Sequence, residues 1–153
     1  MKAVVQRVSK ASVTVEGTLV GNIGRGLVIL IGFSRQDLPQ DIAPMVEKIL
    51  HLRIFEDDQG KMNNSLLEVG GEVLLVSQFT LLGDTRKGRR PNFMEAAPPE
   101  MAQKLYQEFV QEIERQGVKV QTGRFQAHME VQIYNDGPVT LIVERPTVSV
   151  ERP

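Results

Sequence analysis

Leu27-Val28-Ile29-Leu30-Ile31-Gly32-Phe33 is the stretch of this sequence that decides its fold class. It is apolar on both faces, as expected for a strand buried in the middle of a sheet. Gly24-Arg25-Gly26 interrupts the chain directly before it. We therefore expect a central strand here, with neighbouring segments arranged around it.

The residues before this run also indicate β structure. Ala3 to Val8 is a short apolar run, and Ser12-Val13-Thr14-Val15-Glu16 alternates between polar and apolar residues. Gly17-Thr18 has the composition of a hairpin turn that leads into Leu19-Val20. The first part of the chain is thus predicted to contain consecutive antiparallel strands.

Two amphipathic helices are predicted from apolar residues at helical spacing. The first follows Pro39 and presents Ile42, Met45, Val46, Ile49 and Leu50. The second opens at Pro98-Pro99-Glu100, stops at Gly117 and presents Ala102, Leu105, Phe109 and Ile113. Further strands are expected at residues 53–56, 72–79, 118–121, 129–134 and 139–144.

These elements predict a mixed α/β fold, with a mostly antiparallel curved sheet or β-barrel-like core and two main helices packed outside. A chain of 153 residues fits one domain. We assign residues 1–144 to this domain and residues 145–153 to an extended C-terminal tail. Because unpaired sheet edges invite pairing, two copies of the chain are expected to form a homodimer.

Composition excludes several classes of chemistry and partner. The chain has no cysteine and only two histidines, His51 and His128, so we expect neither thiol chemistry nor a metal or cofactor site. No segment approaches the roughly 20 apolar residues of a membrane span, which predicts a soluble cytoplasmic protein without a membrane partner. The net charge of −1 leaves no global basic field, so an RNA contact must be local and no DNA partner is expected.

Two short motifs carry the information about a site. Ser77-Gln78-Phe79-Thr80-Leu81 places hydroxyls and an amide where a strand leaves the core, and Asn135-Asp136-Gly137-Pro138-Val139-Thr140 contains a Gly-Pro turn. The ordinary interpretation of the second is a hairpin connection between two strands. A Gly-Pro bond can also be cis at modest cost, which would let carbonyl groups point in parallel at a ligand.

A basic loop follows the first motif. Asp84 to Pro91 holds Arg86, Lys87, Arg89 and Arg90 against one acidic residue. On charge alone, solubility and phosphate binding are equally good explanations. Its position a few residues after Thr80 favours phosphate.

With these residues the chain resembles the D-aminoacyl-tRNA deacylases, homodimeric editing enzymes that hydrolyse the ester between a D-amino acid and tRNA. The resemblance runs from Met1 to Glu144. Besides the two motifs above, it rests on Gln6-Arg7-Val8, Ala11-Ser12-Val13, Gly60-Lys61-Met62-Asn63 and Thr122-Gly123-Arg124-Phe125.

The resemblance implies roles for individual residues. Ser77, Gln78, Phe79 and Thr80 would form the pocket strand, with Gln78, Phe79 and Thr80 as catalytic candidates. Gly137 and Pro138, with a cis bond between them, would enter the partner subunit's site and exclude L-amino acids. Phe125 and Met129 would hold the terminal adenosine of the tRNA, although core packing is their ordinary interpretation. The four cations of the basic loop would meet acceptor-stem phosphates.

An aminoacyl ester is already activated, so hydrolysis needs a placed water and oxyanion donors rather than a strong base. We therefore expect Thr80 to act as a hydrogen-bond donor rather than a nucleophile. The resemblance further implies that the adjacent ribose 2′-hydroxyl of the substrate helps to activate the water. Both histidines are expected to be structural. Two alternatives stay open, an RNA-binding module without catalysis and a small-ester hydrolase without RNA, and the salt dependence of binding separates them.

Overall fold

The apolar run around Ile29 forms β3 (Gly26–Gly32), the central strand of the main sheet. The computed structural model describes residues 1–145, and in this part the order of strands is β2-β1-β3-β6-β7, with β8 paired to β1. Leu27, Ile29 and Ile31 face one core, whereas Val28 faces a second core on the other side. Burial on both faces explains why this run lacks polar residues.

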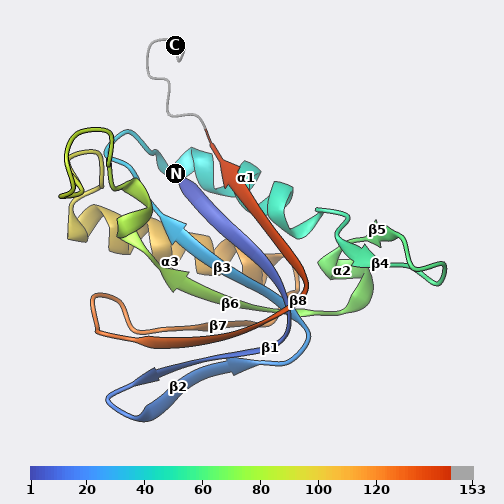
Figure 1. Cartoon of the computed structure of the whole chain (residues 1–153). Coiled ribbons are helices and arrows are strands. Elements are labelled where there is room, and N and C mark those ends of the chain that lie inside the picture. Colours follow the sequence, from blue (N-terminus) through green and yellow to red (C-terminus); the bar gives the residue numbers. More distant parts are fainter. Residues whose placement is uncertain (146–153) are drawn as a thin grey trace.

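β1 (Lys2–Val15) is one long strand where the sequence predicted two shorter runs. It pairs antiparallel with β3 through Lys2–Val8 and with β2 (Thr18–Ile23) through Ala11–Val15. The predicted hairpin is therefore confirmed, with its turn at Glu16-Gly17 rather than at Gly17-Thr18. The long strand bends between these two halves, as Figure 1 shows, and this bend gives the sheet its barrel-like curvature.

β8 (Glu130–Glu144) corrects the prediction of two C-terminal strands joined by a turn. Both halves run antiparallel to β1, and Gln6 pairs with Thr140 while Val8 pairs with Asn135. Residues 136–139 thus lie opposite Arg7 alone. The Gly-Pro motif is a bulge in one continuous strand rather than a chain reversal, because both of its flanks find their hydrogen-bond partners on the same neighbour.

Two parallel pairings complete the sheet. β6 (Glu72–Ser77) lies parallel to β3, and β7 (Val120–Thr122) lies parallel to β6. Parallel neighbours require long crossovers. The first contains η1 (Pro39–Asp41), α1 (Ile42–Leu50), β4 (Phe55–Glu56), β5 (Met62–Asn64) and α2 (Leu66–Val69), and the second contains η2 (Phe79–Leu82) and α3 (Pro99–Arg115).

Both main helices form where apolar spacing predicted them. Pro39 begins the turn of η1 that leads into α1, and Pro99 begins α3, positions at which a missing N–H costs nothing. Gly117, just past the end of α3, has a φ of 82°, the usual conformation of a helix stop. The short helix α2 was not predicted, although Ser65 and Glu68 form a reciprocal cap at its start.

The sheet separates two apolar cores. One lies between the sheet and the helices α1 and α3, and Phe109 and Leu50 are fully buried in it. The other lies inside the curve of the sheet and includes Val13, Ile23 and Leu74. Figure 1 shows both helices on the outer face of the sheet. The predicted fold class is confirmed, with the addition that the β3-β6-β7 part is parallel.

In residues 1–145, no helix has both the length and the apolar character needed to cross a membrane. The predicted tail lies, from residue 146 onward, outside the described residues. The division of the chain after Glu144 therefore stays a prediction.

Candidate active site

A cavity of about 760 Å³ opens where β3, β6 and β7 end. The carboxyl ends of parallel strands are the usual position of ligand sites in α/β sheets. The residues that line it come from these strand ends, η2, the start of α3 and the β7–β8 connection. They include six predicted site residues: Ser77, Gln78, Phe79, Thr80, Phe125 and Met129.

The first motif departs from the strand that the sequence predicted. β6 ends at Ser77, and the chain then turns into the single 3₁₀ turn η2, so Thr80 lies past the end of the strand. The turn passes closely over Gly32, where a Cβ would lie 2.8 Å from the Gln78 carbonyl oxygen and 2.5 Å from Leu82 Cδ2. The glycine inside the central strand therefore makes room for the site.

Thr80 already has a hydrogen-bond partner. Gln78 Nε2 donates to Thr80 Oγ1 at 2.7 Å, and both side chains line the cavity. The backbone N–H groups of Phe79 and Thr80 stand at the start of η2, and neither donates a hydrogen bond to another described residue. Unpaired N–H groups at the first turn of a helix are free to bind an anionic or carbonyl oxygen.

The β7–β8 connection forms the opposite wall. The Arg124 N–H donates to Met129 Sδ at 3.3 Å, which holds the two ends of the connection together. Phe125 packs against Tyr106 with ring centroids 6.1 Å apart. Tyr106 in turn donates to the Leu75 carbonyl at 2.5 Å, and burial raises the pKa of its hydroxyl. Phe125 and Met129 thus line the cavity and also pack against the cores.

The histidines have different positions. His51 caps α1, with Nδ1 2.9 Å from the Glu47 carbonyl oxygen, in agreement with its predicted structural role. His128 is exposed and lines the cavity beside Met129. Gln126 lines it as well and has a φ of 63°, an unusual value for a residue with a side chain. Neither was predicted as a site residue, although both neighbour Phe125 in sequence.

Gly137 and Pro138 do not line the cavity of their own chain. Both are exposed, and the bond between them is cis, as the resemblance implied. Gly137 has a φ of 135°, and a Cβ there would lie 2.9 Å from Val139 Cγ2 and 3.0 Å from Arg7 Nη2. No other residue type fits this position without moving the bulge.

Arg7 holds the bulge and was missed as a functional residue. Its side chain is only 8% exposed. Nε donates to the Asp136 carbonyl at 2.9 Å, and Nη1 donates to the Ile54 carbonyl at 2.8 Å. The available signal was an arginine at the position that continues the alternate apolar residues Ala3 and Val5, which face the core.

The basic loop is exposed throughout residues 85–90. Arg86 is engaged by Asp84, with Nε and Nη2 2.9 and 2.6 Å from its carboxylate oxygens. Hydrogen bonds from Arg86 lower the pKa of Asp84 to about 2. Lys87, Arg89 and Arg90 form no ion pair with another described residue. Within residues 1–145, no cluster of His, Asp and Glu side chains is arranged to hold a metal ion.

A family model described as D-Tyr-tRNA(Tyr) deacylase matches residues 4–144. The chain belongs to this deacylase family. Its predicted membership is confirmed, and with it the assignment to the hydrolases. Relatives named D-aminoacyl-tRNA deacylase are 58% identical in Thermoanaerobacter sp. (strain X514) and 60% identical in Heliobacterium modesticaldum. Each alignment covers 94% of this chain, with 97% and 96% of the respective relatives.

Solved structures agree with the deacylase fold. A protein described as c-Myc DNA Unwinding Element Binding Protein superposes with a TM-score of 0.89 at 45% identity, over 95% of this chain and 99% of that one. A probable eukaryotic D-amino acid tRNA deacylase superposes with a TM-score of 0.80 at 21% identity, over 93% and 97% of the two chains. At that identity the second likeness shows the fold alone.

Proposed function

We propose that this protein hydrolyses the ester between a D-amino acid and the 3′-terminal adenosine of tRNA, releasing both. The observation that carries the proposal is the cavity in which Gln78, Phe79, Thr80, Phe125 and Met129 meet, in a chain of the deacylase family. Its volume of about 760 Å³ suits a nucleoside with an attached amino acid. An aromatic ring and a thioether on one wall suit a purine.

Catalysis on this proposal depends on main-chain donors. The unpaired N–H groups of Phe79 and Thr80 would stabilise the oxyanion that forms when water attacks the ester carbonyl. Preorganised donors of this kind contribute several kcal/mol, about 3 kcal/mol for one donor in a well-studied case. The ester needs no stronger electrophile, because it is already activated.

The cavity offers little support for a threonine nucleophile. Its lining residues include one histidine, His128, and no Asp, Glu or Lys. Gln78 rather than His128 is hydrogen-bonded to the oxygen of Thr80. A threonine hydroxyl without an adjacent base is a weak nucleophile. We therefore assign activation of the water to the substrate, through the ribose 2′-hydroxyl next to the ester.

Discrimination between D- and L-amino acids is assigned to Gly137 and Pro138 of a partner subunit. The bulge is exposed and lies outside its own chain's cavity, which leaves it available to another copy. A rigid wall of backbone would exclude an L side chain and let D side chains point to solvent. Glycine has no side chain to exclude, so glycyl-tRNA is expected to be hydrolysed as well.

The tRNA is expected to bind with its acceptor stem against Lys87, Arg89 and Arg90. These exposed cations have no ion-pair partner among residues 1–145, whereas Arg86 is already paired with Asp84. The name of one structural relative refers to a DNA element, so duplex DNA is a necessary competitor in any binding experiment. On our proposal, uncharged tRNA competes with the substrate and duplex DNA at the same phosphate concentration does not.

The decisive experiment compares D-tyrosyl-, L-tyrosyl- and glycyl-tRNA as substrates and measures release of the amino acid. We expect rapid hydrolysis of the D-ester, slower hydrolysis of the glycyl ester and none of the L-ester above the spontaneous rate. Binding without release would favour an RNA-binding module. Hydrolysis of simple esters with no dependence on salt or RNA would favour a small-ester hydrolase.

Subunit complementation tests the cross-subunit part. Gly137→Val adds a side chain to the backbone wall against which the substrate must fit, and Phe79→Ala removes a cavity side chain, so each homodimer is expected to lose hydrolysis of D-tyrosyl-tRNA. A mixed dimer pairs one Gly137→Val subunit with one Phe79→Ala subunit. If the bulge acts in trans, the unaltered cavity of the first subunit receives the unaltered bulge of the second, and one site is intact. If the bulge acts in its own subunit, neither site is intact. Recovery of activity after co-expression supports this arrangement, and its absence in verified mixed dimers contradicts it.

A further inference from the structure

We propose that Phe93, with Met94 beside it, forms a platform on which the base preceding the terminal adenosine stacks. This inference rests on the proposed function and adds a second nucleotide to it. Phe93 lines the cavity and is 36% exposed, and Met94, the next residue in the chain, is 71% exposed. Exposed apolar side chains gathered beside a cavity indicate a binding surface.

The loop that carries these residues is anchored at both ends. Asp84 and Asn92 exchange backbone hydrogen bonds of 2.7 and 2.9 Å. On the other side of the platform, Arg35 Nε donates to the Met94 carbonyl at 2.6 Å, and the Arg35 N–H donates to the Glu95 carbonyl at 3.0 Å. The loop therefore presents Phe93 in a defined position, which is a condition for a stacking platform.

The Phe93 ring itself is also held. It packs edge-to-face against Phe79 with ring centroids 5.2 Å apart. Its Cε1 would lie 2.9 Å from a Cβ on Gly83, so the ring rests directly on that backbone. The ring is thus fixed by two contacts with the protein, while about a third of the residue stays exposed at 36%.

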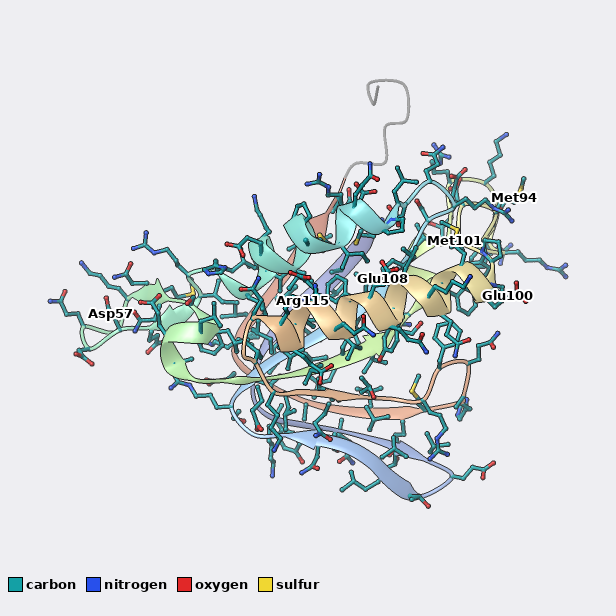
Figure 2. All side chains as sticks on the ribbon, turned by 180° about the vertical axis from the view of Figure 1, so that it is seen from behind. Asp57, Met94, Glu100, Met101, Glu108 and Arg115 are labelled. Carbon is teal, nitrogen blue, oxygen red and sulfur yellow. The ribbon has the colours of Figure 1, made fainter. Side chains whose placement is uncertain are left out.

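Charge identifies the occupant as a single strand of nucleic acid. Lys87, Arg89 and Arg90 lie on the same loop as the platform, without an ion-pair partner in the described part of the chain. A cationic surface next to aromatic rings is the combination with which proteins bind unpaired nucleotides. The 3′ end of tRNA is unpaired and enters the site together with the ester. Figure 2 shows Met94 projecting at this end of the molecule, near Glu100 at the start of α3.

The test compares two D-tyrosyl esters that differ only in the preceding nucleotides. One is D-tyrosyl-tRNA, and the other is the D-tyrosyl ester of adenosine, which has no preceding base. Phe93→Leu keeps an apolar contact with Phe79 but removes the ring. We expect kcat/KM for the tRNA ester to fall by about 5- to 100-fold, with little change for the adenosine ester, and Phe93→Trp to restore it.

Several outcomes overturn the proposal. Equal losses on both esters would show that Phe93 only supports Phe79, and no loss on either would show that no base stacks there. A changed oligomeric state of Phe93→Leu would mark the surface as a protein interface. Leu19→Ala, an exposed apolar residue on β2 at 55% exposure, is the control. Failure of the unaltered protein to hydrolyse either ester would instead contradict the proposed function itself.

Discussion

At the scale of single residues, the hydrogen bond that the Thr80 hydroxyl accepts determines what this side chain can do in the cavity. Gln78 Nε2 lies 2.7 Å from its oxygen, and no lining residue is a carboxylate or lysine. The hydroxyl can donate its proton to a substrate oxygen while its own oxygen is held by Gln78. Thr80 is therefore suited to positioning a substrate.

We predict that Thr80→Ala retains substantial deacylation. The loss of one hydrogen bond of about 1 kcal/mol lowers kcat/KM by about fivefold. Single-turnover hydrolysis of D-tyrosyl-tRNA measures it, with Thr80→Ser as the control that keeps the hydroxyl. A loss of essentially all activity, in a variant that folds and binds tRNA normally, would restore the nucleophile model.

Arg7 links the bulge to the body of the protein. Its guanidinium is almost fully buried and donates to the carbonyls of Asp136 and Ile54. Removing the donors leaves the buried Ile54 carbonyl and the partly buried Asp136 carbonyl unpaired, which costs more than the hydrogen bonds themselves contribute.

For Arg7→Met we predict a free energy of unfolding that is lower by about 2 to 4 kcal/mol. We also predict that L-tyrosyl-tRNA is hydrolysed measurably, because the bulge loses its support. Urea denaturation and an L-ester assay measure the two effects. Arg53→Met, whose guanidinium contacts Asn63 in an exposed position, is the control. If Arg7→Met shows the predicted decrease in the free energy of unfolding but keeps an unchanged preference for the D-ester, Arg7 has no part in discrimination.

At the scale of elements, η2 is placed by its contact with the central strand. The apolar pattern predicted a strand through Phe79, but the chain leaves the sheet after Ser77. The cause is a tertiary contact, because η2 folds back over Gly32 and the Gln78 N–H donates to the Ile31 carbonyl at 2.8 Å. Local sequence contains no sign of this contact beyond the glycine.

Gly32→Ala should therefore damage activity more than stability. A Cβ would meet Gln78 O and Leu82 Cδ2, so η2 must shift and its N–H groups lose their alignment. We expect a loss of about 1 to 3 kcal/mol in stability and a fall of more than tenfold in kcat/KM. Gly24→Ala is the control, since its nearest neighbour would be Glu72 Oε1 at 3.7 Å. Normal activity of Gly32→Ala would show that the placement of η2 is unimportant.

The basic loop leads to a prediction about how tRNA binding depends on salt concentration. The low pKa of Asp84, about 2, keeps this carboxylate charged at neutral pH, and its pairing with Arg86 is lost only as the pH falls through that value. Asp84→Asn frees Arg86 at neutral pH. The slope of log binding constant against log salt for tRNA should then steepen by up to about 0.9.

Fluorescence anisotropy across a salt series measures this slope. Asp57→Asn is the matched control, because Asp57, like Asp84, is a partly exposed aspartate with a lowered pKa, and it lies at the opposite end of the molecule (Figure 2). An identical slope for Asp84→Asn and the unaltered protein would exclude this loop from the tRNA contact.

At the scale of the whole molecule, β8 is an edge strand along most of its length. It pairs with β1 on one side and with no other strand of the described residues. Ile142 on this strand is 68% exposed. An unpaired apolar edge is the kind of surface that a second copy can cover, and the same strand carries Gly137 and Pro138.

Ile142→Lys should therefore weaken the proposed homodimer and, together with it, the rejection of L-tyrosyl-tRNA. The two losses should follow the same dependence on protein concentration, because each cavity needs the partner's bulge. Light scattering and activity measured over one dilution series provide the comparison, with Leu19→Lys as the control. A monomer that still rejects L-tyrosyl-tRNA would contradict the cross-subunit arrangement.

The sequence by itself determined the elements whose signals are local. Apolar runs predicted β3 and β6, helical spacing predicted α1 and α3, and proline and glycine marked the limits of α3. The resemblance to the deacylases predicted the cavity residues at Ser77 to Thr80, Phe125 and Met129. The family model matches residues 4–144, which lie within the segment of that resemblance. These features depend on periodicity and composition, which are properties of neighbouring residues.

Only the tertiary structure decided which partners those elements have. Pairing of both halves of β8 with β1 turned an expected hairpin into a bulge, and burial of Arg7 gave that bulge its support. The parallel alignment of β3, β6 and β7 brought Thr80, Phe93 and Met129 to one cavity from three separate segments. Hydrogen bonds between distant strands and contacts across a packed core set these arrangements, and no local pattern records them.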